Sequence, residues 1–113
     1  MQREIITRRP DLVIRRQILG PGEPMPWQVD PCRRFTVVVR GESLRIEFRG
    51  GDEPLDVPVH AGLADWEEPE ARVHRGVNTG STPYEEVVLF FLPAPDADPQ
   101  PEVESAGGLG SAV

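Results

Sequence analysis

Four residues of the kinds that bind ligands or move protons stand in two short stretches of the sequence. Gln28, Asp30 and Arg34 share one parity of an extended chain, so their side chains can all point the same way. His74 lies in the second stretch. A guanidinium can hold a carboxylate or phosphate through its planar fork, and an imidazole can transfer a proton near neutral pH. Aimed into the mouth of an all-β domain, these side chains would form a polar site.

The residues on either side of the first stretch indicate how it is positioned. Residues 20–26 read Gly-Pro-Gly-Glu-Pro-Met-Pro, a run that cannot be the interior of a helix. After Arg34 comes the apolar and β-branched run Phe-Thr-Val-Val-Val at 35–39, which predicts a strand that ends at the turn formed by residues 40–42.

The rest of the sequence predicts an all-β domain of short strands separated by turns. Leu44, Ile46 and Phe48 alternate cleanly with charged residues, as in a strand with one buried and one wet face. Pro58 removes a hydrogen-bond donor and places its strand at an edge or a bulge. Residues 65–70 are interpreted as a loop or a short turn, and no window has a sustained helical period. Further strands are expected at 3–8, 12–19, 35–40, 55–60, 72–77 and 86–92, a spacing typical of a sandwich, a barrel or a jelly roll.

Composition divides the chain into one domain at 1–92 and a tail at 93–113. The tail is rich in Pro, Gly and acidic residues and has no aromatic residue, so we expect it to be disordered. The formal net charge is −7, but four of the acidic residues lie in the tail. Residues 1–92 therefore carry twelve basic against fifteen acidic groups, a net charge of −3. This balance does not favour nucleic-acid binding, which needs a clustered basic face.

Three further observations suggest a soluble, cytoplasmic protein with no membrane partner. Cys32 is the only cysteine, which rules out an internal disulfide framework and fits a reducing compartment. No apolar run approaches the roughly 20 residues of a membrane span. The N-terminal residues lack the apolar core of a signal peptide.

The stretch around His74 resembles the second sequence motif of the cupin family, usually written P-x-G-x-x-H-x-x-x-N. Pro69, His74 and Asn78 match this pattern at the right spacings, and Ala71 replaces the glycine. The glycine that usually opens the motif is represented by Gly62, one residue too far upstream.

The first stretch is similar in spacing to the first cupin motif, G-x5-H-x-H-x3-E-x6-G. It begins at Gly22, continues through Gln28, Asp30 and Arg34, and ends at Gly41. Every spacing agrees, but all three metal-binding residues of the motif are replaced. The resemblance covers about residues 12–92 and implies a cupin-type jelly-roll β-barrel, also called a double-stranded β-helix.

Typical cupins hold a transition metal through three imidazoles and a carboxylate, and the replacements change what this site could hold. If a divalent metal were bound, Asp30, His74 and Gln28 would be its ligands. Arg34 would place a permanent cation beside it, and two like charges about 4 Å apart cost roughly 4 kcal/mol at an effective dielectric constant of 20. We therefore expect no cofactor and no tightly bound transition metal.

Two interpretations of the replaced site remain open at the level of sequence. In the first, Asp30 and Arg34 form an internal ion pair in one network with Gln28 and His74, and the network only satisfies buried polar groups. In the second, Arg34 also binds a carboxylate or phosphate of a small ligand, with Gln28, Asp30 and His74 around it and Trp27 near the rim.

The function that we predict is the binding of a small organic anion, such as a carboxylate, without a metal. The alternatives are a metal-dependent enzyme with an atypical Asp30 and His74 site, or a metal-free isomerase or epimerase that uses His74 as its acid or base. Whether the protein is an enzyme is left open. By analogy with cupins of this size, a homodimer is expected, and the apolar N-terminal strands would suit it.

Overall fold

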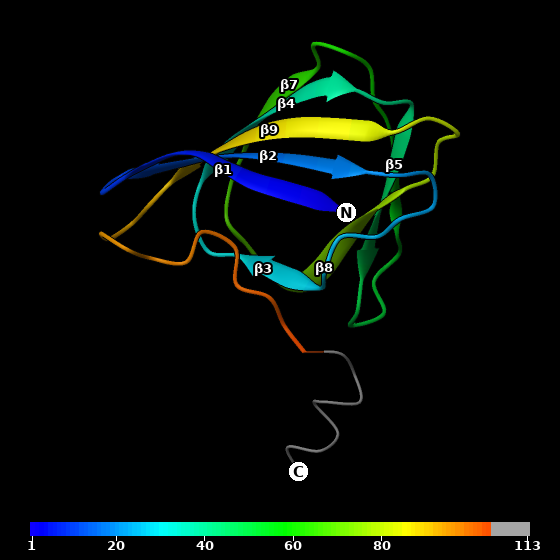
Figure 1. The fold of residues 1–113 in the computed structure, drawn as a ribbon. Coiled ribbons are helices and arrows are strands. Elements are labelled where there is room, and N and C mark those ends of the chain that lie inside the picture. Colours follow the sequence, from blue (N-terminus) through cyan, green and yellow to red (C-terminus); the bar gives the residue numbers. More distant parts are fainter. Residues whose placement is uncertain (105–113) are drawn as a thin grey trace.

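The computed structural model of the chain describes residues 1–104, which fold into nine antiparallel strands in two sheets (Figure 1). The five-stranded sheet has the order β1-β2-β9-β4-β7, and the four-stranded sheet has the order β3-β8-β5-β6. The described residues contain no helix, and hence none long and apolar enough to cross a membrane. The strands are β1 (Gln2–Arg9), β2 (Leu12–Leu19), β3 (Gln28–Asp30), β4 (Arg34–Arg40), β5 (Ser43–Phe48), β6 (Leu55–Pro58), β7 (Ala64–Glu67), β8 (Glu70–Asn78) and β9 (Tyr84–Phe91).

Side chains at alternate positions of the strands point inward and fill the space between the sheets. In β2, Val13 and Leu19 are fully buried, whereas Leu12 and Ile14 on the other parity are partly exposed. In β9 the buried parity carries Tyr84, Glu86, Val88 and Phe90. The core is divided into one cluster around Leu19, Met25, Val38, Leu44, Val59 and Tyr84, and another around Val13, Cys32, Val88 and Phe90.

The predicted strands are present, and β6 is the edge strand that Pro58 predicted. The expectation of a loop or short turn at residues 65–70 is corrected, because this segment includes most of strand β7. β7 pairs with β4, with Trp66 opposite Phe35 and Glu67 opposite Arg34. This segment has too few apolar residues to be recognised as a strand by its pattern. Its pairing partner determines its conformation.

Two residues of the motif stretches have structural roles. Asn78 is fully buried, and its side-chain amide donates hydrogen bonds to the carbonyl oxygens of Leu19, Gly20 and Thr82. It thereby ties the end of β8 to the end of β2. Gly41 has φ of +152°, and a Cβ atom there would lie 2.8 Å from Cδ1 of Tyr84. A side chain at this position would displace a core residue.

The segment after β9 differs from the sequence expectation over residues 99–103. The backbone N–H of Val29 donates to the carbonyl of Pro101 (3.1 Å), and the N–H of Val103 donates to the carbonyl of Trp27 (2.8 Å). An antiparallel bridge joins Gln28 to Glu102. The outer edge of β3 supplies backbone partners that composition alone does not reveal. The domain boundary at residue 92 stays a prediction, and residues 105–113 lie outside the described part of the chain.

Candidate functional site

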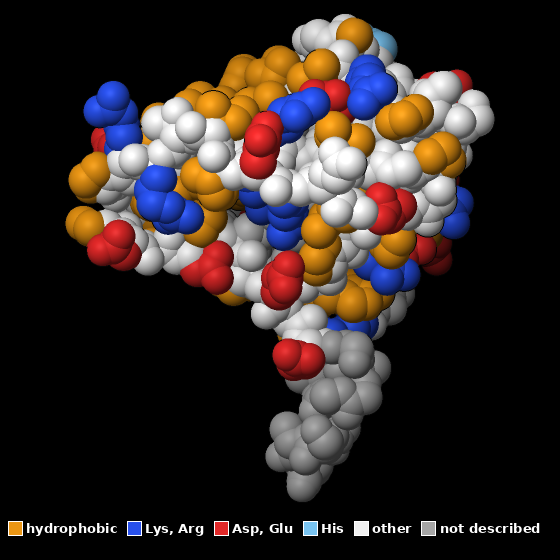
Figure 2. Space-filling view, in the orientation of Figure 1, with side chains coloured by type: hydrophobic (Ala, Val, Ile, Leu, Met, Phe, Trp, Pro, Cys, Tyr) orange, Lys and Arg blue, Asp and Glu red, His pale blue; other side chains and the backbone are white. Residues whose placement is uncertain are grey.

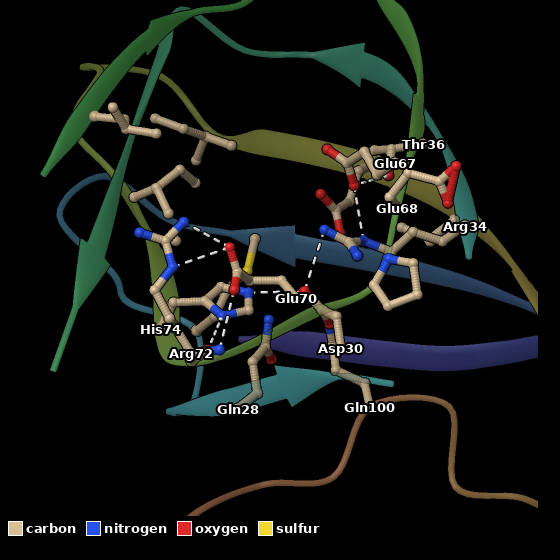
Figure 3. A pocket seen from close by; sticks show the side chains of 18 of the residues that line it. Gln28, Asp30, Arg34, Thr36, Glu67, Glu68, Glu70, Arg72, His74 and Gln100 are labelled. Carbon is tan, nitrogen blue, oxygen red and sulfur yellow. Dashed lines mark hydrogen bonds and ion pairs between the residues drawn. The ribbon is translucent and has the colours of Figure 1, made fainter. Parts of the chain in front are cut away.

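A cavity of about 430 Å³ lies between the two sheets and holds the polar residues of both motif stretches (Figure 3). Its walls come from strands of both sheets, with an apolar part and a polar part. The apolar part includes Met25, Leu44, Ile46, Phe48, Leu55 and Val88. The polar part includes Gln28, Asp30, Arg34, Glu67, Glu68, Glu70, Arg72, His74, Glu86 and Gln100.

The structure brings together four of the five residues predicted for the site. Gln28 and Asp30 flank Val29 in β3 and point inward, as their shared parity predicted. Arg34 enters from the start of β4 in the opposite sheet, and His74 enters from β8, where it pairs in register with Gln28. His74 meets Gln28 because β8 pairs with β3, and Arg34 meets Asp30 because β3 and β4 belong to different sheets.

Trp27 is the predicted site residue that does not line this cavity. It precedes Gln28, so alternation turns its side chain to the other face of the sheet. There the indole ring lies under the guanidinium groups of Arg75 (4.3 Å from Cζ to the ring centroid) and Arg49 (5.9 Å). The expectation of a rim position for Trp27 is corrected by the same parity rule that placed Gln28 inside.

Asp30 is the centre of the polar network and has a side chain that is only 1% exposed. Its Oδ2 accepts a hydrogen bond from Nε2 of His74 (2.7 Å) and forms an ion pair with Nη2 of Arg34 (3.1 Å). Its Oδ1 accepts a hydrogen bond from Nε2 of Gln100 (2.6 Å). Burial by itself would raise the pKa of Asp30, but His74, Arg34 and Gln100 outweigh it and hold the pKa below its usual range. Asp30 is therefore a carboxylate.

Both ring nitrogens of His74 face acceptors. Nδ1 lies 2.7 Å from the carbonyl oxygen of Arg72, which can only accept, and Nε2 faces the carboxylate of Asp30. Burial lowers the pKa of the imidazole, but the hydrogen bonds to Asp30 and to the Arg72 carbonyl raise it above its ordinary value overall. This geometry fits an imidazolium whose two protons are both committed.

Arg34 is held by two carboxylates and retains one unused donor. Its Nε pairs with Oε2 of Glu67 (2.7 Å), and its Nη2 pairs with Asp30. Its Nη1 is buried and has no hydrogen-bond partner among residues 1–104. The same is true of Oε1 of Gln28 and Oε1 of Gln100. Buried polar groups are normally paired, so these three atoms mark places where a ligand could bind.

Two functional candidates were missed by the sequence reasoning. Glu86 is buried in the cavity wall, where it accepts a hydrogen bond from the hydroxyl of Tyr84 (2.7 Å). Burial raises the pKa of Glu86 above its ordinary value, against the opposing effects of Tyr84 and Arg15. Its parity with Tyr84 and Val88 would have placed it inward. Gln100 carried no such signal, because it lies in a Pro-rich segment without strand periodicity.

The acidic residues at the cavity rim have basic partners. Glu67 pairs with Arg34, and Glu68 accepts a hydrogen bond from Nε of Arg33 (3.0 Å). Glu70 binds the side chain and backbone N–H of Arg72, which lowers the pKa of this carboxyl to about 2. Most of the negative charge around the cavity is therefore balanced locally.

The residues present do not fit a transition-metal site. A metal needs a lone pair on the imidazole, but both nitrogens of His74 face acceptors and carry protons. Arg34 adds a cation at the Asp30 oxygen that accepts from His74. Over residues 1–104, no group of three His, Cys, Asp or Glu side chains is arranged to hold a metal ion.

No protein-family model matches the sequence, and no curated protein is significantly similar to it. Solved structures are similar in fold. A cupin domain from Bordetella pertussis Tohama I has a TM-score of 0.71 and 13% identity over 80% of this chain and 92% of the other. An uncharacterised protein with a double-stranded β-helix domain from Klebsiella pneumoniae has a TM-score of 0.66 and 23% identity over 92% and 84%. The polyketide cyclase RemF from Streptomyces resistomycificus has a TM-score of 0.64 and 15% identity over 92% and 71%.

These likenesses agree with the all-β topology and with the cavity enclosed between two antiparallel sheets. They cover most of each chain, so they concern the whole domain and not a single hairpin. The predicted fold class is confirmed: the chain has the fold of the cupins, a jelly-roll β-barrel or double-stranded β-helix.

Proposed function

We propose that this protein binds a small organic anion, a monocarboxylate with an apolar body, in the cavity between the sheets, without a tightly bound transition metal. The observation that carries the proposal is Nη1 of Arg34, a buried cationic donor without a partner among residues 1–104, in a cavity of about 430 Å³. Cavities of this size are typical of small-molecule sites. An uncompensated buried donor costs free energy that a ligand oxygen would recover.

The partners of Arg34 support an anion at this position. Glu67 and Asp30 each accept from one donor of the guanidinium, and Asp30 also pairs with the protonated His74. Two cations and two anions therefore make this cluster of four groups close to neutral. The ligand carboxylate would accept from Nη1 of Arg34, and its second oxygen could accept from the amide of Gln28 if that amide is turned to present its nitrogen.

The apolar wall supports a ligand with a hydrocarbon or aromatic portion. Met25, Leu44, Ile46 and Val88 supply apolar surface to the same cavity. Burying a ligand surface against them stabilises the complex by about 25 cal/mol for each Å² of apolar area removed from water. The proposed ligand is therefore larger and less polar than acetate.

The test is a titration of benzoate and phenylacetate, each compared with its uncharged amide, by calorimetry. The wild type should bind the carboxylates more tightly than the amides. Arg34→Gln should remove this preference, whereas Arg33→Gln, which changes an exposed arginine one residue away, should retain it. Equal binding by the wild type and Arg34→Gln would contradict the proposal. Near-stoichiometric metal in protein purified without chelators would contradict its metal-free part.

A metal-free isomerase or epimerase is the second candidate, and the state of Glu86 favours it. Asp30, with a lowered pKa, and Glu86, with a raised pKa, line one cavity. Two carboxyl groups whose pKa values differ in this way can act as a base and an acid. RemF, which has this fold, is a polyketide cyclase. The fold itself does not assign a reaction to this chain.

This second candidate predicts exchange of carbon-bound protons with solvent. Hydroxy ketones and β-keto acids would be incubated with the protein in deuterated water and followed by proton NMR. Glu86→Gln should abolish any catalysed exchange. Glu85→Gln is the matched control, because Glu85 points away from the cavity and pairs with Arg16 and Arg40. Catalysed exchange that survives in Glu86→Gln would exclude this role for Glu86.

The proposal includes a homodimer formed through the outer face of the five-stranded sheet. Registered neighbours Ile14, Leu89, Phe35 and Trp66 form an apolar row across β2, β9, β4 and β7. Trp66 is 52% exposed, and its ring packs against Phe91 (5.3 Å between centroids). Figure 2 shows hydrophobic side chains gathered at the upper left of the view, over these strands. Apolar surfaces of this kind commonly mark interfaces.

A further inference from the structure

A second cavity, of about 520 Å³, lies between the β1-β2 hairpin and the C-terminal segment. The cavity that holds Arg34 is separate, and Gln100 lines both. Its walls contain three arginines on one side and residues 98–102 on the other. The three arginines are Arg3, Arg8 and Arg15. No reaction or ligand described above uses this second cavity.

Arg15 is the innermost of these arginines. It lies on the buried parity of β2 and is 6% exposed, and the structure records no side-chain hydrogen bond or ion pair for it with residues 1–104. Its Nε is fully buried and has no hydrogen-bond partner in the described part of the chain. The guanidinium lies over the ring of Phe90, 4.9 Å from its centroid, which holds it in place but does not neutralise it.

Arg3 lies beside Arg15 and also retains an unused donor. Its Nε donates to Oε1 of Gln17, and its Nη1 lies 3.4 Å from Oε1 of Glu102. Its Nη2 is buried and has no partner among the described residues. Burial and the neighbouring charge of Arg3 lower the pKa of Arg15 to about 10, so Arg15 is still charged at neutral pH.

The acidic residues near this cavity lie at its rim, not at its base. Glu4, Asp98 and Glu102 are exposed, and Glu4 pairs with Arg16 on the outer face. Two buried carboxyls, Glu86 and Asp30, also act on Arg15, but neither lines this cavity. Glu86 is held by Tyr84 and Gln17, and Asp30 by His74, Arg34 and Gln100. In Figure 2, acidic and basic side chains lie close together on this face of the molecule. Two guanidinium groups thus face the cavity with N–H donors that no residue of 1–104 pairs.

We propose that this second cavity binds a phosphoryl group, as inorganic phosphate or as a phosphate monoester, between Arg15 and Arg3. Planar guanidinium forks bind phosphate oxygens through paired hydrogen bonds, and Arg8 at the rim adds a third positive charge. A dianion matches two adjacent cations, the buried Arg15 and the partly exposed Arg3, better than a monocarboxylate does. A bound phosphate would also supply the partners that Nε of Arg15 and Nη2 of Arg3 lack. This site is independent of the function proposed for the cavity around Arg34.

The probe is inorganic phosphate, titrated into the full chain by calorimetry at constant ionic strength, with chloride replaced by phosphate. The wild type should bind one equivalent saturably, and Arg15→Gln should raise Kd by about tenfold or more. Arg16→Gln is the matched control. Arg16 is the next residue of the same strand, faces the opposite side and pairs with Glu4 and Glu85, so its replacement should leave Kd unchanged.

Two further variants keep the test decisive if Arg15→Gln does not fold. Arg15→Lys retains the charge and loses the fork, and Arg3→Gln changes the more exposed partner. Each should weaken phosphate binding several-fold. Comparison with glucose 6-phosphate tells a free phosphate site from a monoester site. The proposal is overturned if the folded wild type shows no saturable binding up to about 10 mM phosphate. It is also overturned if Arg34→Gln abolishes binding while the folded variants of Arg15 and Arg3 do not.

Discussion

Nε2 of His74 lies 2.7 Å from Oδ2 of Asp30, while Nδ1 of the same ring faces the backbone carbonyl of Arg72. The pair is buried, with 8% and 1% of the two side chains exposed. Because the carbonyl cannot donate, Nδ1 carries a proton, and the ionised Asp30 requires a proton on Nε2 as well. The residue that matches the metal-binding histidine of the second cupin motif is thus engaged as a cation in an ion pair.

The first prediction concerns the charge of His74. Two-dimensional NMR of the imidazole nitrogens should show the doubly protonated ring persisting above pH 6.5, the ordinary pKa of the group. Asp30→Asn should lower the pKa of His74, because burial then acts without the opposing carboxylate. A ring that is already neutral at pH 6.5 in the wild type would contradict the ion pair.

The second prediction is the pH dependence of stability. The folded-state pKa of His74 is above 6.5, so its contribution is complete below pH 6.5 and is lost as the pH rises through the folded value. The folded-state pKa of Asp30 is below 3.8, so its contribution is present above pH 3.8 and is lost as the pH falls through the folded value. Urea unfolding should therefore show stability that falls as the pH rises above 6.5, and His74→Gln should flatten that decline. An unchanged slope in His74→Gln would assign the decline to other groups.

The third prediction is that Asp30→Asn strongly destabilises the fold. The substitution leaves Arg34 and His74 buried without their shared carboxylate, and breaking one side of a buried ion pair typically costs about 3–5 kcal/mol. The measurement is the free energy of unfolding in urea. Asp56→Asn is the control. It breaks an exposed pair with Arg45 and should change stability by less than about 1 kcal/mol. Similar losses in both variants would contradict the central role of Asp30.

The fourth prediction concerns the C-terminal segment. The amide of Val29 donates to Pro101, and that of Val103 donates to Trp27, so both should exchange with deuterium far more slowly than amides of an unstructured chain. Ending the chain after Asp98 should make Val29 exchange fast. The amide of Met25, which donates to Gly76 within the barrel, should keep its protection and serves as an internal reference. Fast exchange at Val29 in the full chain would contradict the pairing.

The fifth prediction tests the homodimer. Leu89 lies between Ile14 and Phe35 on the outer face of the five-stranded sheet, so Leu89→Glu should place a charge in the centre of the interface and give a folded monomer. Light scattering after size exclusion measures the mass. Ala61→Glu adds the same charge in an exposed loop and should remain dimeric. A monomeric wild type at about 0.1 mM would contradict the dimer.

The sequence predicted most of the fold because its signals are local. The alternation of Leu44, Ile46 and Phe48 identifies β5 and the face that lines the cavity. The two motif spacings predicted that Gln28, Asp30, Arg34 and His74 lie in one site, and all four line the same cavity. β7 was missed because its four residues become a strand through pairing with β4, a contact distant in sequence.

The parts of the site that the sequence interpretation missed are of two kinds. One depends on contacts between residues distant in sequence, and the other on strand alternation that was not extended to every residue. Gln100 reaches Asp30 across 70 positions of sequence from a segment whose composition suggested disorder. Glu86 could have been found from the alternation of Tyr84, Val88 and Phe90 in β9. Alternation along the stretch that contains Gln28 and Asp30 would have placed Trp27 on the outer face.

The pairing of residues 99–103 with β3 also bears on how the protein behaves at high concentration. β3 is an edge strand of the four-stranded sheet, and an open edge is a template on which other chains can add strands and aggregate. Pro101 and Val103 take up backbone groups on that edge, and Pro101 itself has no N–H with which to recruit a further strand. Loss of this segment by proteolysis would therefore expose a surface prone to self-association while the barrel core stays in place.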